Sequence, residues 1–407
     1  IEKGGEITYS GRGSAGGFML NNILGFTTMD VVSSPVKLYP ERFLSKTRIL
    51  ETKSMADIDL NFGTPEIAVE AQEEVMGEGH SYWMLTYGTY KAKAAWKMFA
   101  KAQNISYVIA EAVTKQIERY EHVLKETSDD EKENVHVEDY IDDEYIEIFN
   151  KSRNYLGIVT SLSRHPCSSL LYQGDIRREI GLITIKSGKK ETLCCLMDGK
   201  WAEKYKFLKN DILKVSVVAV IKELFRQSKI PEMTVDELEK ACENNPSVWD
   251  IYSKGITLGI NQVEGAATTA RVAKYKPKNI SELCAFVAAI RPGFKSMYKR
   301  FENREEFHYN IPSIDNLIQT EQFPQSYILY QEQVMQILHY AGIPLDETYG
   351  VIKNIAKKRV DEVKKYKDLF IDNMINKLII EEHYDKDKAT QTAKDIWQII
   401  DDNSNYS

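Results

Sequence analysis

Asp57 and Asp59 are the first residues in this sequence whose types and spacing could do chemistry. They alternate in Asp57-Ile58-Asp59-Leu60, and alternate residues of a strand point to the same face. Two neighbouring carboxylates repel each other unless a cation lies between them. Mg²⁺ prefers oxygen ligands and binds through one or two carboxylates together with substrate phosphates. The pair therefore indicates a divalent metal site, although most such pairs in soluble proteins are ordinary exposed charges.

A third carboxylate, Asp211, lies far downstream in Leu208-Lys209-Asn210-Asp211. If that segment is extended, Lys209 and Asp211 share one face. A two-metal site needs carboxylates from more than one strand, because one ion activates the attacking hydroxyl and the other holds the phosphates. A neighbouring lysine offsets charge that develops on those phosphates. Taken alone, Asp211 is more often an ordinary surface residue.

The segment Gly11-Arg12-Gly13-Ser14-Ala15-Gly16-Gly17 precedes a stretch, 18–24, that is compatible with a helix. Backbone N–H groups at a helix start can receive a phosphate, and the Ser14 hydroxyl is a further donor. The segment lacks the Gly-Lys-Ser/Thr ending of a Walker A loop and the strand–turn–helix order of a dinucleotide fingerprint. A phosphate-binding turn and a plain flexible turn both remain open here.

The charge of the chain is unevenly distributed along its 407 residues. The net charge of −7 argues against a protein that merely coats phosphates, because nonspecific DNA affinity comes mainly from Lys and Arg. Acidic residues concentrate in 129–147, whereas basic residues concentrate in 291–304 and 353–367. This distribution leaves two interpretations open, a basic groove on an acidic molecule and runs that are solvated surface.

Several classes of protein are disfavoured by the composition. Five irregularly spaced cysteines do not form a disulfide framework, and a reducing cytoplasm fits them best. No apolar run approaches the roughly 18 residues needed to cross a bilayer. The chain starts at Ile and ends in a loop-like sequence, so we expect a piece of a longer protein.

The segments that would position these residues show both helical and strand patterns. The first sixty residues predict a mixed α/β unit, and the pattern is helical from Thr64 to about Tyr120. Strands are expected at Leu182–Ile185 and in the run Glu191–Leu196, separated by the turn Ser187-Gly188-Lys189. The remainder is mainly helical, with an N-cap expected at Asn279.

An ordered set of motifs runs through nearly the whole chain. It comprises Gly11-Arg12-Gly13-Ser14, Glu41-Arg42-Phe43-Leu44, Asp57-Ile58-Asp59, Thr86-Tyr87-Gly88-Thr89 with Lys93, Arg164-His165, Leu208-Lys209-Asn210-Asp211, Arg291-Pro292-Gly293 and Tyr330-Gln331-Glu332-Gln333-Val334-Met335-Gln336. In this set the chain resembles the alpha subunit of bacterial DNA polymerase III, the C family of replicative polymerases. The resemblance is to a divergent form like those of some bacteriophages.

The resemblance implies an α+β fold. It predicts a palm like that of polymerase beta and related nucleotidyltransferases, a helical thumb inserted between the second and third aspartates, and large, mainly helical fingers. The implied boundaries are 1–88 for the first part of the palm, 89–160 for the thumb, 161–216 for the second part of the palm, and 217–407 for truncated fingers.

The resemblance also implies roles for individual residues. The family's metal-binding and catalytic aspartates fall on Asp57, Asp59 and Asp211, which would hold two Mg²⁺ ions. The positions that would contact the nucleotide are Gly13, Ser14, Arg42, Lys93, Lys209, Arg291 and Lys353. The positions that would contact DNA are Lys357, Lys358 and Arg359. His165 matches a family position, and no catalytic role is assigned to it.

The implied function is template-directed DNA polymerisation in DNA replication. The expected partners are primer–template DNA, deoxynucleoside triphosphates and, through regions outside this chain, a sliding clamp and other replisome proteins; no membrane partner is expected. Two alternatives remain open: a non-templated nucleotidyltransferase with the same palm, and a catalytically inactive, DNA-binding relative that acts as a replisome scaffold.

Overall fold

The computed structural model describes residues 2–27, 31–32, 34, 36–46, 49–50, 59–127, 132–233, 235–243, 245–320, 323–357 and 359–404. Helices and strands are mixed in it, which confirms the expected fold class at that level. The chain forms two compact units. The first consists of Ile1–Gly5 and Thr64–Lys214, and the second of Glu6–Gly63 and Val215–Ser407.

Five neighbouring strands organise the first unit, in the order β7-β4-β3-β6-β5. Its strands are β3 (Ser81–Thr89), β4 (Val159–Leu171), β5 (Leu182–Ser187), β6 (Lys190–Cys195) and β7 (Leu208–Lys214). The β3–β6 pair is parallel and the other pairs are antiparallel. The expected β5–β6 hairpin is confirmed, and Gly188 in its turn has the positive φ of +60° that glycine adopts without strain.

The expectation of a helical pattern from Thr64 to about Tyr120 is wrong in one place. Helices α3 (Pro65–Met76), α4 (Ala92–Ala102) and α5 (Tyr107–Glu126) do occur, but Ser81–Thr89 is strand β3. Its aromatic residues and threonines favour a strand, and Met84 and Leu85 are completely buried in it. Pairing with β4, which is distant in sequence, therefore outweighs the local pattern.

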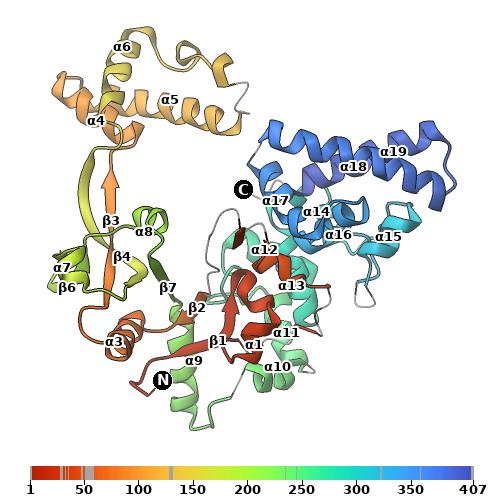
Figure 1. The fold of residues 1–407 in the computed structure, drawn as a ribbon, viewed down its shortest axis with the longest axis horizontal. Helices are drawn as coiled ribbons and strands as arrows, with labels where there is room; N and C mark the ends of the chain where they lie inside the picture. The colour runs from red at the N-terminus through yellow and green to blue at the C-terminus, as the bar shows by residue number, and fades with distance from the viewer. Residues whose placement is uncertain are drawn as a thin grey trace. The chain divides into compact units, whose positions relative to one another are not determined.

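Helices α4, α5 and α6 (Asp143–Ser152) form a group of their own at the ends of β3 and β4, here called the helical cap (Figure 1). Short turns η3 (Lys132–Asn134), η4 (Val137–Asp139) and η5 (Arg153–Tyr155) connect and end them. Trp96, Ile117 and Phe149 are buried together in the cap. The sheet has a separate core around Met84 and Leu170, to which α7 (Ile176–Glu179) and α8 (Gly199–Lys204) contribute.

The second unit begins with the antiparallel strands β1 (Ile7–Arg12) and β2 (Asp59–Phe62). Three short elements follow β1, namely η1 (Gly13–Gly17), α1 (Met19–Ile23) and α2 (Pro40–Phe43). The rest of the unit is helical. Its elements are α9 (Ser216–Ser228), α10 (Val235–Glu243), α11 (Pro246–Ser253), α12 (Ala266–Tyr275), α13 (Ile280–Ala289), η6 (Pro292–Phe294), α14 (Tyr298–Glu302), α15 (Pro312–Ile318), α16 (Gln331–Tyr340), α17 (Leu345–Ala356), α18 (Val360–Glu381) and α19 (Lys386–Ser404).

Two hydrophobic clusters hold helices α11–α19. One gathers α11–α14, with Phe286 and Tyr275 at its centre, and the other gathers α15–α19 around Val334 and Phe370. The N-cap expected at Asn279 is confirmed, because its side chain accepts a hydrogen bond from the Glu282 N–H. Of the helices described, none is both long and apolar enough to span a lipid bilayer.

Candidate active site

Asp211 lies in β7 directly opposite Ser168 of β4. The buried Ser168 hydroxyl donates a hydrogen bond to Oδ1 of Asp211, and Lys209 Nζ lies 2.9 Å from Oδ2. Lys209 and Asp211 thus share a face, as their alternation in the sequence predicted. Oδ1 of Asp211 is oriented by a buried hydroxyl, while Oδ2 faces the Lys209 ammonium.

His165 supports the backbone that presents Ser168. Its Nδ1 accepts hydrogen bonds from the N–H groups of Ser168, at 2.9 Å, and Cys167, at 3.3 Å. Burial lowers the pKa of His165, and nearby Lys209 lowers it further, while Asp211 acts in the opposite direction. Because Nδ1 accepts both backbone N–H groups, the proton of the neutral ring lies on Nε2.

The opposite face of β4 and β7 carries a second polar group. Gln72 of α3 donates to Ser81 Oγ, at 2.7 Å, and to Ser169 Oγ, at 2.9 Å. Its oxygen accepts from Asn210 Nδ2 at 2.6 Å. Because neighbouring strand residues face opposite sides, Ser168 and Ser169 serve different groups. Asn210 helps to fix α3 on the sheet, and Asp211 is left on the other face.

Asp59 begins β2 in the second unit and pairs in register with Arg12 at the end of β1. Gly13 follows with a φ of +63°, which disfavours any residue with a side chain. A Cβ at Gly13 would lie 3.7 Å from Asp59 Oδ2, so the turn passes close to this carboxylate. Ser14 lies in η1, but its side chain and the whole of Asp57 are outside the described residues.

Arg42 and Lys353, which come from different sequence motifs, meet at one aromatic ring in the second unit. The Arg42 guanidinium lies 4.2 Å and the Lys353 ammonium 4.5 Å from the centroid of Tyr349. Arg42 Nε lies 3.8 Å from Glu332 Oε1, which is too long for a hydrogen bond. This Nε is buried and lacks a hydrogen-bond partner among the described residues, so the place suits an additional anion.

Lys93 lies elsewhere, in the helical cap. It projects from α4, and its ammonium is 2.7 Å from Glu118 of α5. The side chains of both residues are about half exposed, so the pair is a surface ion pair of small energetic value. The structure therefore gives Lys93 a partner in the cap rather than beside Asp211.

Of the remaining basic residues of the expected site, Arg291 lies by itself, whereas Lys357 and Arg359 lie together at the junction of α17 and α18. Arg291 is exposed just after α13, and Lys357 is exposed at the end of α17. Arg359 precedes α18 and forms a surface ion pair with Glu362 at 3.2 Å. Lys358 is outside the described residues.

The donor chemistry of the aspartates suits a hard divalent cation. Across the part of the chain that the structure describes, no three His, Cys, Asp or Glu side chains form a metal-ligand group, and Asp57 is not in that part. Lys209 beside Oδ2 shows that the surroundings of Asp211 accommodate a positive group. Carboxylate oxygens of this kind are the ligands that Mg²⁺ prefers.

Residues 2–214 match the model of the bacterial DNA polymerase III alpha NTPase domain. Residues 215–378 match that of the bacterial DNA polymerase III alpha subunit finger domain. The chain belongs to the DNA polymerase III alpha family. The two matches meet between Lys214 and Val215, where the chain also passes from the first compact unit to the second.

Named DNA polymerase III alpha subunits resemble the chain over most of its length. The Aquifex aeolicus protein is 25% identical over 98% of this chain, and the Bacillus subtilis protein is 22% identical over 99%. The Thermus aquaticus protein is 26% identical over 89% of the chain. These matches cover 35%, 35% and 30% of the respective relatives, so the chain spans about a third of their length.

In this DNA polymerase III alpha chain, no sequence pattern indicated that Ser168 and Tyr349 belong to the site, and His165 was noted there without a role. Ser168 reaches Asp211 only through the register of β4 on β7. Tyr349 meets Arg42 through the packing of α2 on α17. Neither relation leaves a local pattern in the sequence. The short spacing between His165 and Ser168 was the one available signal.

Proposed function

We propose that this chain is the catalytic part of a template-directed DNA polymerase. It would join a primer 3′-hydroxyl to the α-phosphate of a deoxynucleoside triphosphate and release pyrophosphate. The observation that carries the proposal is the Asp211 carboxylate, held between Ser168 and Lys209 within the region that matches the family model. The relatives from Aquifex aeolicus and Bacillus subtilis are named as DNA polymerase III alpha subunits, which supports the same activity.

Asp57, Asp59 and Asp211 would hold two Mg²⁺ ions in a palm of the polymerase-beta type. When bound, the ions would activate the primer hydroxyl and neutralise charge on the phosphates. The chain's own groups prepare this site. Ser168 fixes Oδ1 of Asp211, and the Gly13 turn leaves room beside Asp59.

The triphosphate would contact basic groups from several elements. Arg42 and Lys353 meet at Tyr349, and the buried Nε of Arg42 supports a phosphate there. Lys209, which lies 2.9 Å from Asp211 Oδ2, would contribute a positive charge to the phosphates beside that carboxylate. Gly13 and Ser14 would contribute donors at a helix start.

Three further assignments rest on the resemblance. Lys93 and Arg291 would contact the nucleotide, with Lys93 first leaving Glu118. The DNA would meet Lys357, Lys358 and Arg359.

The domains proposed are palm (1–88 and 161–216), thumb (89–160) and fingers (217–407). The separate core of the helical cap supports the thumb assignment. The proposed setting is the cytoplasm of a bacterial or phage-infected cell, where the whole protein would work with a sliding clamp and other replisome proteins.

Primer extension on a defined primer–template tests the proposal. The chain, with Mg²⁺ and one nucleotide at a time, should add only the nucleotide complementary to the template. Addition of any nucleotide regardless of template would indicate the non-templated transferase instead. DNA binding without addition, also in a chain extended to its natural ends, would indicate the scaffold.

Ser168→Ala should lower kcat for single-nucleotide addition by about tenfold, because a hydrogen bond to a charged group is worth about 1.5–3 kcal/mol. The neighbouring Ser169→Ala is a matched control, since Ser169 is equally buried but contacts Gln72. Ser169→Ala should lower stability without this loss of kcat in the folded fraction. Pre-steady-state extension with active-site titration measures both variants. Equal losses of kcat would contradict a role for Ser168 in orienting Asp211.

A further inference from the structure

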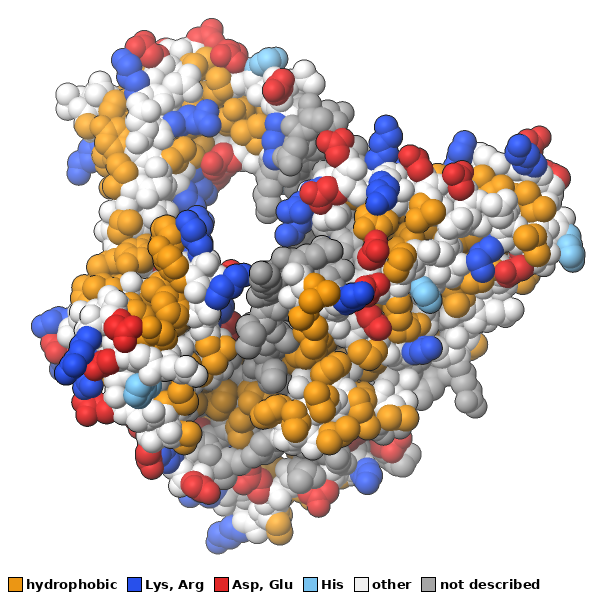
Figure 2. Space-filling model, viewed as in Figure 1, with side chains coloured by type: hydrophobic (Ala, Val, Ile, Leu, Met, Phe, Trp, Pro, Cys, Tyr) orange, Lys and Arg blue, Asp and Glu red, His pale blue; other side chains and the backbone are white. Residues whose placement is uncertain are grey.

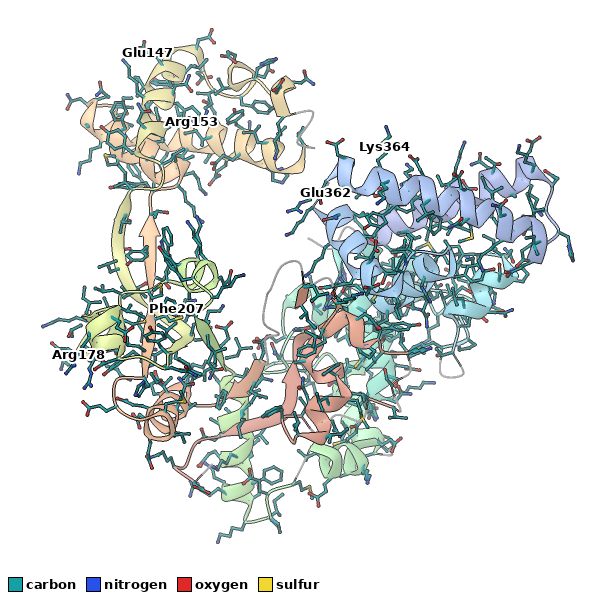
Figure 3. All side chains as sticks on the ribbon, viewed as in Figure 1. Glu147, Arg153, Arg178, Phe207, Glu362 and Lys364 are labelled. Atoms are coloured by element: carbon teal, nitrogen blue, oxygen red, sulfur yellow. The ribbon has the colours of Figure 1, made fainter. Side chains whose placement is uncertain are left out.

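Two aromatic side chains stand exposed on α8 and at the residue that ends it, in the same unit as Asp211. Trp201 is 42% exposed and Tyr205 is 60% exposed. One helical turn separates them, and their rings stack with centroids 5.7 Å apart and planes 21° apart. Phe207 continues the row, 6.2 Å from Tyr205, and lies beside α8 (Figure 3). We call Trp201, Tyr205 and Phe207 the aromatic row.

The exposure of Trp201 is unusual within this chain. All five tryptophans lie in the described residues, and the other four, at positions 83, 96, 249 and 397, are each 8% exposed or less. Helix α8 buries its Ala202 completely and is capped by Asp198, which accepts a hydrogen bond from the Trp201 N–H. The helix is therefore well anchored, with Trp201 and Tyr205 exposed, while Phe207 is half-buried against the core of the sheet. Clustered exposed apolar side chains mark binding surfaces.

Lysines are interleaved with these rings. Lys200, Lys204 and Lys206 are exposed around the row, and Lys204 Nζ lies 4.6 Å from the centroid of Trp201. Glu203 is the acidic residue among them. Hydrophobic side chains cover this part of the first unit, with Lys or Arg at their border (Figure 2). Aromatic rings with neighbouring positive charges are the combination that binds single-stranded nucleic acid, because bases stack while lysines meet phosphates.

The aromatic row lies close to Lys209, which in turn lies beside Asp211. A Cβ at Gly199 of α8 would lie 3.8 Å from Lys209 Cδ, and Glu203 Oε1 lies 4.0 Å from Lys209 Nζ. The same ammonium is 2.9 Å from Asp211 Oδ2. A single strand of nucleic acid bound at α8 would therefore pass next to the carboxylate at which nucleotide addition is proposed.

We propose that the aromatic row and its lysines bind an unpaired stretch of DNA, with one or two bases stacked on Trp201 and Tyr205. In a polymerase this stretch is the single-stranded template ahead of the primer end. That identification of the strand rests on the proposed function, whereas binding of an unpaired strand does not. A protein partner would fit the rings less well, because three lysines surround them.

Tryptophan fluorescence gives a direct test, because Trp201 is the solvent-exposed indole. Titration of the whole chain with an oligothymidylate, without nucleotide or metal, should quench its emission and protect it from acrylamide. Trp201→Leu should abolish the quenching and weaken binding about tenfold, since stacking supplies much of the affinity per base. Trp201→Phe should restore most of the affinity, because it keeps an aromatic ring for stacking. A merely apolar contact would not require an aromatic ring, so leucine and phenylalanine would then bind alike.

Tyr107→Leu is the matched control, because Tyr107 is an exposed aromatic residue of α5 in the same unit. It should bind the oligonucleotide like the parent chain. Parent-like affinity of Trp201→Leu, or loss of affinity in Trp201→Phe as well, would overturn the proposal. So would an indole shielded from acrylamide before DNA is added, since that would mean another copy of the chain covers the row. Primer extension by a chain whose tryptophan emission is not quenched by the oligonucleotide would refute this binding site alone. Quenching in a chain that does not extend primers would refute the proposed polymerase activity alone.

Discussion

Asp211→Asn is expected to reduce template-directed nucleotide addition by at least about 1000-fold while preserving the fold. The amide has the shape of the carboxylate, and its oxygen can still accept the Ser168 hydrogen bond. It lacks the negative charge that a divalent cation requires, and its NH₂ group would face Lys209. Single-turnover extension at saturating DNA and nucleotide measures this loss.

Asp250→Asn is the matched control for that change. Asp250 is an exposed aspartate of α11 whose carboxylate is 3.0 Å from Lys254, one helical turn away. Its replacement should leave extension unchanged and alter stability by less than about 0.5 kcal/mol. If Asp211→Asn also extended primers at the parent rate, the proposed metal site would have to be abandoned.

Joint replacement of Arg42 and Lys353 by alanine should lower kcat/KM for the incoming nucleotide by about 100-fold, mainly through KM. Each charged group contributes about 1.5–3 kcal/mol when it binds a phosphate oxygen. The single variants should not be additive, because both cations lie on the Tyr349 ring. A double-mutant cycle on nucleotide KM, with primer–template affinity measured separately, gives the coupling.

Lys364→Ala serves as the control for the double variant, since Lys364 is an exposed lysine of α18 (Figure 3). It removes one positive charge from the second unit but lies outside the Tyr349 site. Its nucleotide KM should match that of the parent chain. An equal rise in KM for Lys364→Ala would mean that general charge, rather than a specific phosphate site, governs nucleotide affinity.

The parts of the fold that could be predicted are those set by local pattern. Alternation of Lys209 and Asp211 predicted their common face, and Ser187-Gly188-Lys189 predicted the turn of the β5–β6 hairpin. Asn279 predicted its helix start by capping chemistry. Each of these relations involves residues a few positions apart, where strand periodicity, turn geometry and side-chain caps act directly.

The parts that could not be predicted depend on contacts between distant segments. Strand β3 lies within a stretch that was expected to be helical, and its pairing with the distant β4 establishes it as a strand. Ser168 meets Asp211 because of strand register, and a shift by one residue would place Ser169 there instead. Arg42 meets Lys353 across more than 300 residues of chain, since 353 minus 42 is 311.

The ribbon of β3 and β4 that carries the helical cap has a consequence for protein engineering. The chain enters the cap after Thr89 and leaves it before Val159, and these two residues are paired in register. Both junctions therefore lie side by side, and the cap has a hydrophobic core of its own. A cap from a homologue could be exchanged at this single seam, provided that the ribbon is lengthened or shortened by two residues at a time in both strands. Such a change would set the reach of the cap in steps of about 7 Å without turning the inner face of the ribbon outward.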